Sequence, residues 1–137
     1  MKLAVEYGAK RIGHGIRAYN DAEMKQILKE NDICLTLCPT SNLQTKALAG
    51  VTQMSQYPLQ AFLAGGVPVC INTDNMTVSN TTVRKELQKL YDAGILNSTQ
   101  AALMVRIAIS HAFLSEDERA ELLNKAERIM NCCPVLF

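Results

Sequence analysis

Three short polar clusters in this sequence each follow an apolar, strand-like segment. An imidazole lies between two glycines at His14, a hydroxyl and an amide follow one another at Ser41 and Asn42, and a carboxylate precedes an amide at Asp74 and Asn75. In parallel α/β folds, ligand-binding residues gather at the carboxyl ends of the strands. If the three strands are neighbours, these side chains meet at one rim and form a candidate ligand-binding site.

Each cluster also has a purely structural interpretation. His14 fits a turn, or a buried imidazole with satisfied hydrogen bonds. Ser41 and Asn42 fit a turn or a helix cap, and Asp74 with Asn75 fits a loop closure, because Asn and Asp are favoured turn residues. The residues taken alone therefore indicate a site without specifying a reaction.

The other metal-ligand residue types do not form a cluster. Cys34 and Cys38 are four positions apart, but no second Cys or His pair lies near enough to complete a structural zinc site. Cys34 and Cys70 lie in apolar runs, where a reduced thiol acts as a small hydrophobic group. His111 lies between two helical stretches with no identifiable partner, and we expect it to be structural or solvent-facing.

The elements that must position the polar clusters alternate between helix and strand. Asn20 and Glu23 predict a capping box at the start of one helix, and Ser115 and Glu118 predict another at the start of the last helix, whose apolar residues fall on one side. The predicted strands cover residues 10–13, 33–37 and 67–71, and the predicted helices cover 2–7, 20–29, 58–65, 80–93, 98–107 and the segment after 115.

This alternation predicts an α/β fold with a parallel sheet and right-handed crossovers. Two architectures fit it: an open doubly wound sheet, or a piece of a (β/α)₈ barrel. A whole barrel typically needs about 250 residues, whereas this chain has 137. Three strands leave two unpaired sheet edges, and exposed edges favour pairing with another chain.

Composition and charge exclude several classes of protein. The chain has 48% hydrophobic and 20% charged residues, with a net charge of +1, which is ordinary for a globular domain and argues against a dedicated nucleic-acid binder. No apolar run approaches the roughly 18 residues of a membrane helix, and the first residues do not fit a signal peptide. We expect a single domain over residues 1–137 in a cytoplasmic protein.

Five segments in the right order and spacing resemble the motif series of the adenosine deaminase family, and together they cover nearly the whole chain. They are Arg11-Ile12-Gly13-His14-Gly15, Cys38-Pro39-Thr40-Ser41-Asn42, Tyr57-Pro58-Leu59, Ile71-Asn72-Thr73-Asp74-Asn75 and the stretch from Ala112 to Arg119. The resemblance implies a partial (β/α)₈ TIM barrel, with strands six to eight, their helices and C-terminal helices. Members of this family are zinc-dependent and convert adenosine and water to inosine and ammonia.

The resemblance also implies a role for three residues. His14 matches the catalytic histidine that positions and polarises the zinc-bound hydroxide. Asp74 matches an aspartate that binds zinc and hydrogen-bonds the hydroxide. Asn75 stands where a second aspartate often contacts the purine, so we expect it to bind substrate as a subfamily variant.

What the chain lacks limits what it is expected to do alone. The family takes its zinc histidines from a His-x-His segment and from strand five, and its glutamate acid/base from a His-Ala-Gly-Glu segment. This chain contains two histidines, and neither lies in such a segment. We therefore expect a C-terminal fragment that is inactive by itself, with zinc bound only in the complete enzyme.

The expected partners are adenosine or a related purine nucleoside, and either a second copy of the chain or a missing N-terminal half. Two alternatives stay open. One is a non-catalytic remnant that serves as an assembly or interaction module. The other is a deaminase for another adenine-containing substrate, since most base and sugar contacts of the family lie outside this segment.

Overall fold

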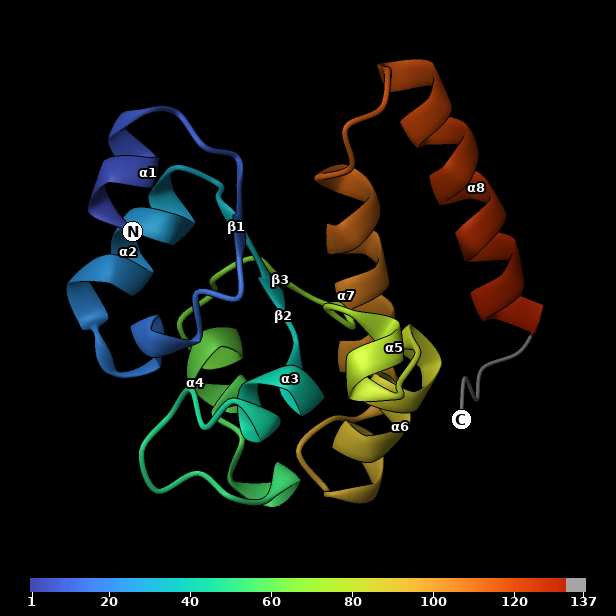
Figure 1. Ribbon diagram of the computed structural model, residues 1–137. Helices are drawn as coiled ribbons and strands as arrows, with labels where there is room; N and C mark the ends of the chain where they lie inside the picture. The colour runs from blue at the N-terminus through green and yellow to red at the C-terminus, as the bar shows by residue number, and fades with distance from the viewer. Residues whose placement is uncertain (133–137) are drawn as a thin grey trace.

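The computed structural model describes residues 1–132, which form one parallel sheet flanked by helices (Figure 1). The strands β1 (Arg11–Gly13), β2 (Cys34–Leu37) and β3 (Val69–Ile71) lie in the order β1-β2-β3. The helices are α1 (Lys2–Glu6), α2 (Ala22–Glu30), α3 (Pro39–Gln44), α4 (Leu59–Ala64), α5 (Met76–Ser79), α6 (Val83–Asp92), α7 (Ser98–Ser110) and α8 (Glu116–Cys132), with short 3₁₀ helices η1 (Ile16–Asn20) and η2 (Met54–Gln56). The predicted α/β class and parallel sheet are confirmed.

The central strand β2 is buried on both faces. Its partners are parallel on either side, with Cys34 opposite Arg11 and Leu35 opposite Val69. Leu35 and Leu37 point to one face and Cys34 to the other, and all three are fully buried. This burial explains why β2 reads as a continuous apolar run, which is typical of parallel sheets covered by helices.

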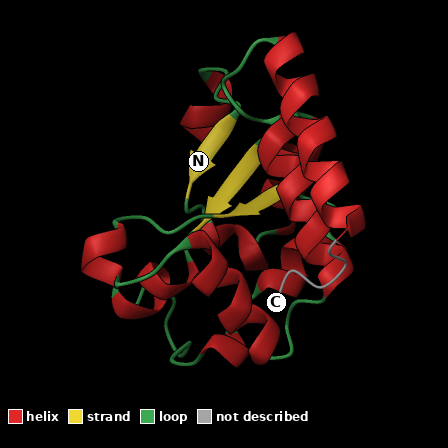
Figure 2. Cartoon of the chain, turned by 90° about the vertical axis from the view of Figure 1, so that its right-hand side faces the viewer, coloured by secondary structure: helices red, strands yellow, loops and turns green. Residues whose placement is uncertain are grey.

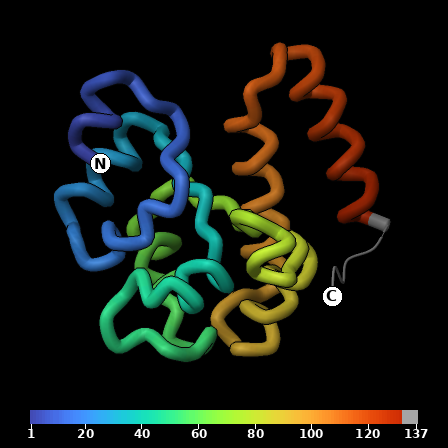
Figure 3. The backbone as a smooth tube through the Cα atoms, in the orientation of Figure 1, coloured from blue at the N-terminus to red at the C-terminus, as the bar shows by residue number. Residues whose placement is uncertain are grey.

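Residues of α2, α4 and α7 pack into one core against the sheet face that carries Leu35 and Leu37. Figure 1 shows α1 and α2 to one side of the strands and α7 and α8 to the other, and in Figure 2, after a quarter turn, the strands lie beside and partly behind two long helices. The tube in Figure 3 shows that the first half of the chain gathers on one side and α6 to α8 on the other. Because all strands run the same way, their carboxyl ends meet at one rim.

The helix starts follow the predicted capping chemistry with one correction. Asp21, rather than Asn20, caps α2, and its carboxylate accepts a hydrogen bond from the Met24 N–H at 2.9 Å. Asn20 instead closes the preceding 3₁₀ helix η1. The box between Ser115 and Glu118 is confirmed, with bonds in both directions between backbone and side chain.

The segment after β2 forms a helix where a turn or a cap was the competing expectation. Pro39 occupies the first position of α3, where its fixed φ suits a helix and its missing N–H costs nothing. Ser41 and Asn42 therefore lie in the first turns of a helix, and each is 5% exposed. Rigid helical backbone, rather than a loop, carries both side chains to the rim.

The last helix packs against α7 but keeps apolar groups in contact with solvent. Arg106 on α7 pairs with Glu127 on α8 at 2.5 Å. Leu122, Leu123 and Ile129 on α8 remain 40%, 36% and 52% exposed. No helix among residues 1–132 combines the length and apolar content needed to cross a bilayer.

Candidate functional site

His14 follows β1 directly and adopts an uncommon backbone conformation. Its φ is 56°, in the left-handed region, and its N–H donates to the carbonyl of Thr36 on β2 at 3.0 Å. Gly15 comes next with φ 66°, and a Cβ at Gly15 would lie 2.7 Å from the Leu35 side chain. A side chain at Gly15 would crowd Leu35 and strain the backbone, so glycine is favoured here, and the chain turns away while His14 stays at the rim.

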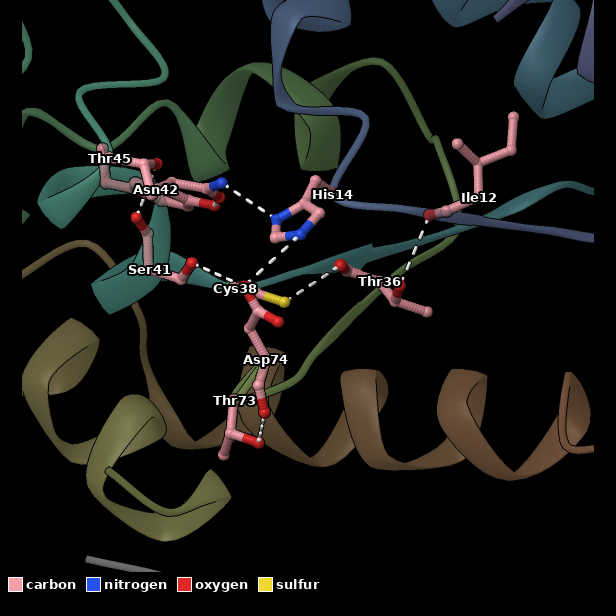
Figure 4. A network of polar contacts seen from close by, with 10 residues as sticks. Ile12, His14, Thr36, Cys38, Ser41, Asn42, Thr45, Thr73 and Asp74 are labelled. Carbon is pink, nitrogen blue, oxygen red and sulfur yellow. Dashed lines mark hydrogen bonds and ion pairs between the residues drawn. The ribbon is translucent and has the colours of Figure 1, made fainter. Parts of the chain in front are cut away.

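Asp74 lies beside His14 although the two are sixty positions apart. The Asp74 carboxylate oxygen Oδ2 is 3.7 Å from His14 Nε2 (Figure 4). Asp74 also has a positive φ, 57°. Strained backbone of this kind clusters at functional sites, and here it occurs at both members of the pair. The predicted meeting of the imidazole and the carboxylate at one rim is confirmed.

The α3 helix supplies a hydrogen bond to each member of the pair. Ser41 Oγ donates to Asp74 Oδ2 at 2.7 Å, and the Asn42 amide nitrogen lies 3.0 Å from His14 Nδ1. The bond from Ser41 is the main reason why the pKa of Asp74 lies below its ordinary value. Asp74 is therefore an anion at neutral pH, and both rim residues are held by a rigid neighbour.

The Asn42 side chain is itself fixed by a hydrogen bond from the protein core. Its Oδ1 accepts a hydrogen bond from the hydroxyl of Tyr57 at 2.9 Å, and Tyr57 is 3% exposed. Burial raises the pKa of Tyr57, so this hydroxyl keeps its hydrogen at neutral pH. Tyr57, Asn42 and His14 thus form a continuous chain from the core to the rim.

A buried carboxylate anchors the start of α3. Glu86 on α6 is 0% exposed, and it accepts hydrogen bonds from the Thr40 N–H at 2.8 Å and from the Thr81 hydroxyl at 2.5 Å. Lys89 donates to the Thr40 hydroxyl at 2.8 Å and lies 3.9 Å from Glu86. These contacts fix the backbone immediately before the two α3 residues that touch the rim pair.

The rim residues open onto a cavity of about 490 Å³. His14 and Asp74 are partly exposed to it, with side-chain exposures of 43% and 44%. Such a volume fits a small organic molecule. The lining consists of the polar residues His14, Arg17, Ser41, Asn42, Thr45 and Asp74, together with Met1, Ile12, Gly13, Gly15, Ile16 and Ala47.

The nearby thiol is not a nucleophile in this arrangement. Burial raises the pKa of Cys38 to about 11, so the thiol is protonated at neutral pH. Cys34 and Cys70 are buried free thiols whose sulfurs lie 3.7 Å apart across β2 and β3. Both lie buried in strands, as the apolar runs around them predicted.

Two predicted residues differ from the rest of the cluster. Asn75 follows Asp74, but its side chain caps α5 by accepting from the Val78 N–H at 3.0 Å, and it is not among the described residues that line the cavity. His111, for which the sequence identified no partner, was expected to be structural or solvent-facing, and the structure supports the structural alternative. Its Nε2 lies 3.2 Å from the Asp32 carbonyl, because the end of α7 packs onto the turn before β2.

Sequence reasoning missed Glu86 as a site residue and did not connect Tyr57 to Asn42. For Glu86 a signal exists: Val83, Glu86, Leu87 and Leu90 share the i, i+3, i+4, i+7 spacing of one helix face. A carboxylate on an apolar face needs buried hydrogen-bond donors. No comparable sequence signal links Tyr57 to Asn42, which are fifteen positions apart.

The cluster does not form a zinc site within the described residues. Catalytic zinc typically has three protein ligands, and no group of three or more His, Cys, Asp or Glu side chains able to hold a metal occurs among the described residues. His14 and Asp74 offer one nitrogen and one carboxylate at a common point. Zinc would need further ligands from outside this cluster.

Comparison with known proteins assigns a family to this arrangement. A sequence model described as adenosine deaminase matches residues 3–129. The adenosine deaminase of Enterococcus faecalis is 45% identical over 122 residues, which are 89% of this chain and 35% of that protein. The chain therefore spans about a third of the length of the curated relatives that it matches.

Solved structures show the same fold. The adenine deaminase of Arthrobacter aurescens matches with a TM-score of 0.82 and 28% identity, over 89% of this chain and 36% of that one. A zinc-bound amidohydrolase from Burkholderia ambifaria matches with a TM-score of 0.83 and 17% identity, over 96% and 36%. Since the family model covers nearly all of the sequence, the chain belongs to the adenosine deaminase family.

Proposed function

We propose that this chain is the C-terminal part of a zinc-dependent adenosine deaminase and carries strands six to eight of its (β/α)₈ barrel. The observation that supports this most is the 3.7 Å approach of His14 and Asp74 at the carboxyl ends of β1 and β3. Strand ends on one rim are where barrel enzymes place their active sites. Residues 1–137 would then form a single, incomplete domain.

In this proposal His14 orients and polarises the water that attacks C6 of the purine. Asp74 is one metal ligand and accepts a hydrogen bond from the same water. When bound, zinc lowers the pKa of a water to about 7 and so supplies hydroxide at neutral pH. The ligands that complete the metal site, and the glutamate that the family uses as acid and base, would come from the remainder of the barrel.

The role of Asn75 is a narrower proposal. Its Oδ1 is occupied by the α5 cap, so the group free to meet a purine is the amide nitrogen, a hydrogen-bond donor. We propose that Asn75 donates to a ring nitrogen of a purine bound beside Asp74. A carboxylate at this position would accept a hydrogen bond instead and would add charge.

Adenosine is the substrate that we favour, because the 45% identical relative is an adenosine deaminase. Adenine is the second candidate, since the structurally similar protein from Arthrobacter aurescens is an adenine deaminase with 28% identity. Both substrates present the same amino group and ring to His14 and Asp74. They differ in the ribose, which this cluster does not identify.

The expected binding partner is the rest of the barrel, in a cytoplasmic protein. Strands β1 and β3 form the edges of the described sheet and have no further strand beside them there. Open edges pair with other chains, so we expect the isolated chain to self-associate when that partner is missing. Light scattering that finds a stable monomer at high concentration would contradict this expectation.

Complementation tests the proposed function. The chain is mixed with a separately produced segment that carries the first five barrel strands of an adenosine deaminase, together with zinc and adenosine. We expect deamination, seen as loss of absorbance near the adenosine maximum, only when both parts are present. Adenine in place of adenosine tests the second substrate. Two folded, associated parts that turn over neither substrate would leave the non-catalytic interpretation.

A further inference from the structure

The hydroxyl of Tyr57 has one hydrogen-bond partner among the described residues, the Oδ1 atom of Asn42 at 2.9 Å. Tyr57 is 3% exposed, so solvent offers no ready substitute. Leaving a buried O–H without an acceptor carries the full desolvation penalty of the group. The Tyr57 hydroxyl therefore donates, and the Asn42 amide must present its oxygen to Tyr57.

This direction fixes the other end of the Asn42 amide. With Oδ1 turned to Tyr57, the Nδ2 hydrogens of Asn42 point to His14 Nδ1, 3.0 Å away. An amide nitrogen only donates, so His14 Nδ1 has to accept. A neutral imidazole carries one hydrogen, and an accepting Nδ1 leaves that hydrogen on Nε2.

We propose that Tyr57, acting through Asn42, is a positioning residue that sets the tautomer of His14 and places the Nε2 hydrogen toward Asp74 and the cavity. His14 Nε2 lies 3.7 Å from Asp74 Oδ2, so the hydrogen faces the point where the two side chains converge. The opposite orientation of Asn42 would place the hydrogen on Nδ1 and leave a lone pair facing the Asp74 carboxylate. Tyr57 thereby prevents a contact between two acceptors at the rim.

The catalytic meaning of this arrangement rests on the proposed function, although the tautomer itself does not. An Nε2–H can donate to a water oxygen beside Asp74, while the carboxylate accepts from the same water. One group that donates and one that accepts can hold a water in a defined orientation. Tyr57 would act without touching substrate.

The test is the ¹⁵N spectrum of the imidazoles in the 137-residue chain, at a pH where both histidines are neutral. Protonated and unprotonated ring nitrogens have separate signals, so the tautomer is read directly. We expect His14 to have a bare Nδ1. In Tyr57→Phe the ring still fills its site but no hydroxyl holds Asn42. We therefore expect the population ratio of the Nδ1–H tautomer to the Nε2–H tautomer of His14 to rise roughly fivefold.

Two further variants distinguish a specific effect on His14 from a general loss of folded structure. Tyr7→Phe removes a hydroxyl from a residue that is 87% exposed, and it should leave His14 unchanged. Asn42→Asp puts only acceptors beside Nδ1, so His14 should change to the Nδ1–H tautomer. The signals of His111, which lies at the opposite end of the sheet, report whether each variant is folded.

A His14 spectrum that stays the same in Tyr57→Phe while His111 shows a folded chain would overturn the proposal. So would an Nδ1–H tautomer in the unaltered protein. Failure of the proposed function has a different signature: the predicted tautomer shifts would occur, but complementation would give no deamination. The two ideas can therefore fail separately.

Discussion

The two histidines of this chain lie at opposite ends of the sheet and are held in different ways. His14 follows β1 at the carboxyl end, is 43% exposed, and contacts the side chains of Asn42 and Asp74. His111 lies at the amino end, where Nδ1 is 3.0 Å from the Ile107 carbonyl and Nε2 is 3.2 Å from the Asp32 carbonyl. Its side chain is only 10% exposed.

The difference separates a structural imidazole from one available for chemistry. Both ring nitrogens of His111 face backbone carbonyls, so this residue ties the end of α7 to the turn before β2. His14 has one nitrogen held by a side chain and the other directed at a carboxylate beside a cavity. A histidine beside an aspartate is therefore not diagnostic, because Asp32 Oδ1 also lies 3.3 Å from His111.

The difference between the two histidines is tested most strongly by removing each imidazole in turn. In the complemented deaminase, His14→Ala should lower kcat/KM by about 10²- to 10³-fold, the usual range for the loss of one preorganised hydrogen-bond donor at the reacting centre. His111→Ala should keep activity within the same order of magnitude. Rates are measured by the adenosine absorbance assay with matched amounts of folded complex, and equal losses in both variants would remove the distinction.

The next largest effect concerns the anchor behind the rim. Glu86→Ala leaves the Thr40 N–H and the Thr81 hydroxyl without their acceptor, and we expect the free energy of unfolding to fall by about 2–4 kcal/mol. Glu86→Gln keeps an oxygen for Thr40 and should recover most of this loss. Lys85→Ala, at an exposed neighbouring position, is the matched control. If urea unfolding gives Glu86→Ala and Lys85→Ala the same free energy of unfolding, the anchoring role of Glu86 is contradicted.

A smaller effect should appear in the titration of the rim carboxylate. Ser41→Ala removes the main cause of the lowered pKa of Asp74, so that pKa should rise toward the ordinary value of 3.8. A lowered folded-state pKa contributes stability above 3.8 that is lost as the pH falls through the folded value. The advantage of the unaltered protein over Ser41→Ala should therefore be present at neutral pH and vanish in acid.

The control for this titration lies on α8, where the Ser115 side chain lowers the pKa of Glu118. Ser115→Ala should raise the pKa of Glu118 and leave the pKa of Asp74 unchanged. Ser41→Ala should raise the pKa of Asp74 and leave the pKa of Glu118 unchanged. Carbon-13 spectra of the carboxyl groups follow both residues in one sample. If Asp74 titrates identically with and without Ser41, the proposed hydrogen bond is absent in solution.

The fold could be predicted from sequence where local chemistry agrees with packing. The apolar runs gave the three strands, and the box at Ser115 and Glu118 gave the start of the last helix. Local signals failed where two caps compete: Asn20 and Asp21 are both good capping residues, and the turn that includes η1 decides for Asp21. The helix at Pro39 was missed because its polar first turn lacks apolar periodicity.

The candidate site could be predicted in part. The strand ends placed His14 and Asp74 at one rim because parallel strands share direction. The support around them depends on contacts over long separations, such as Glu86 to Thr40 and Tyr57 to Asn42, which no local pattern encodes. The substrate role assigned to Asn75 remains a prediction, since its side chain caps α5 in this structure.

Zinc affinity tests most directly whether the rim is one part of a shared site. The dissociation constant is measured by competition with a chelator for the chain alone, for the complemented barrel, and for both with Asp74→Ala. We predict tight binding only in the complemented barrel, weakened strongly by Asp74→Ala, and no Asp74-dependent binding in the chain alone. Tight zinc binding by the isolated chain, or a complemented barrel indifferent to Asp74→Ala, would contradict this account.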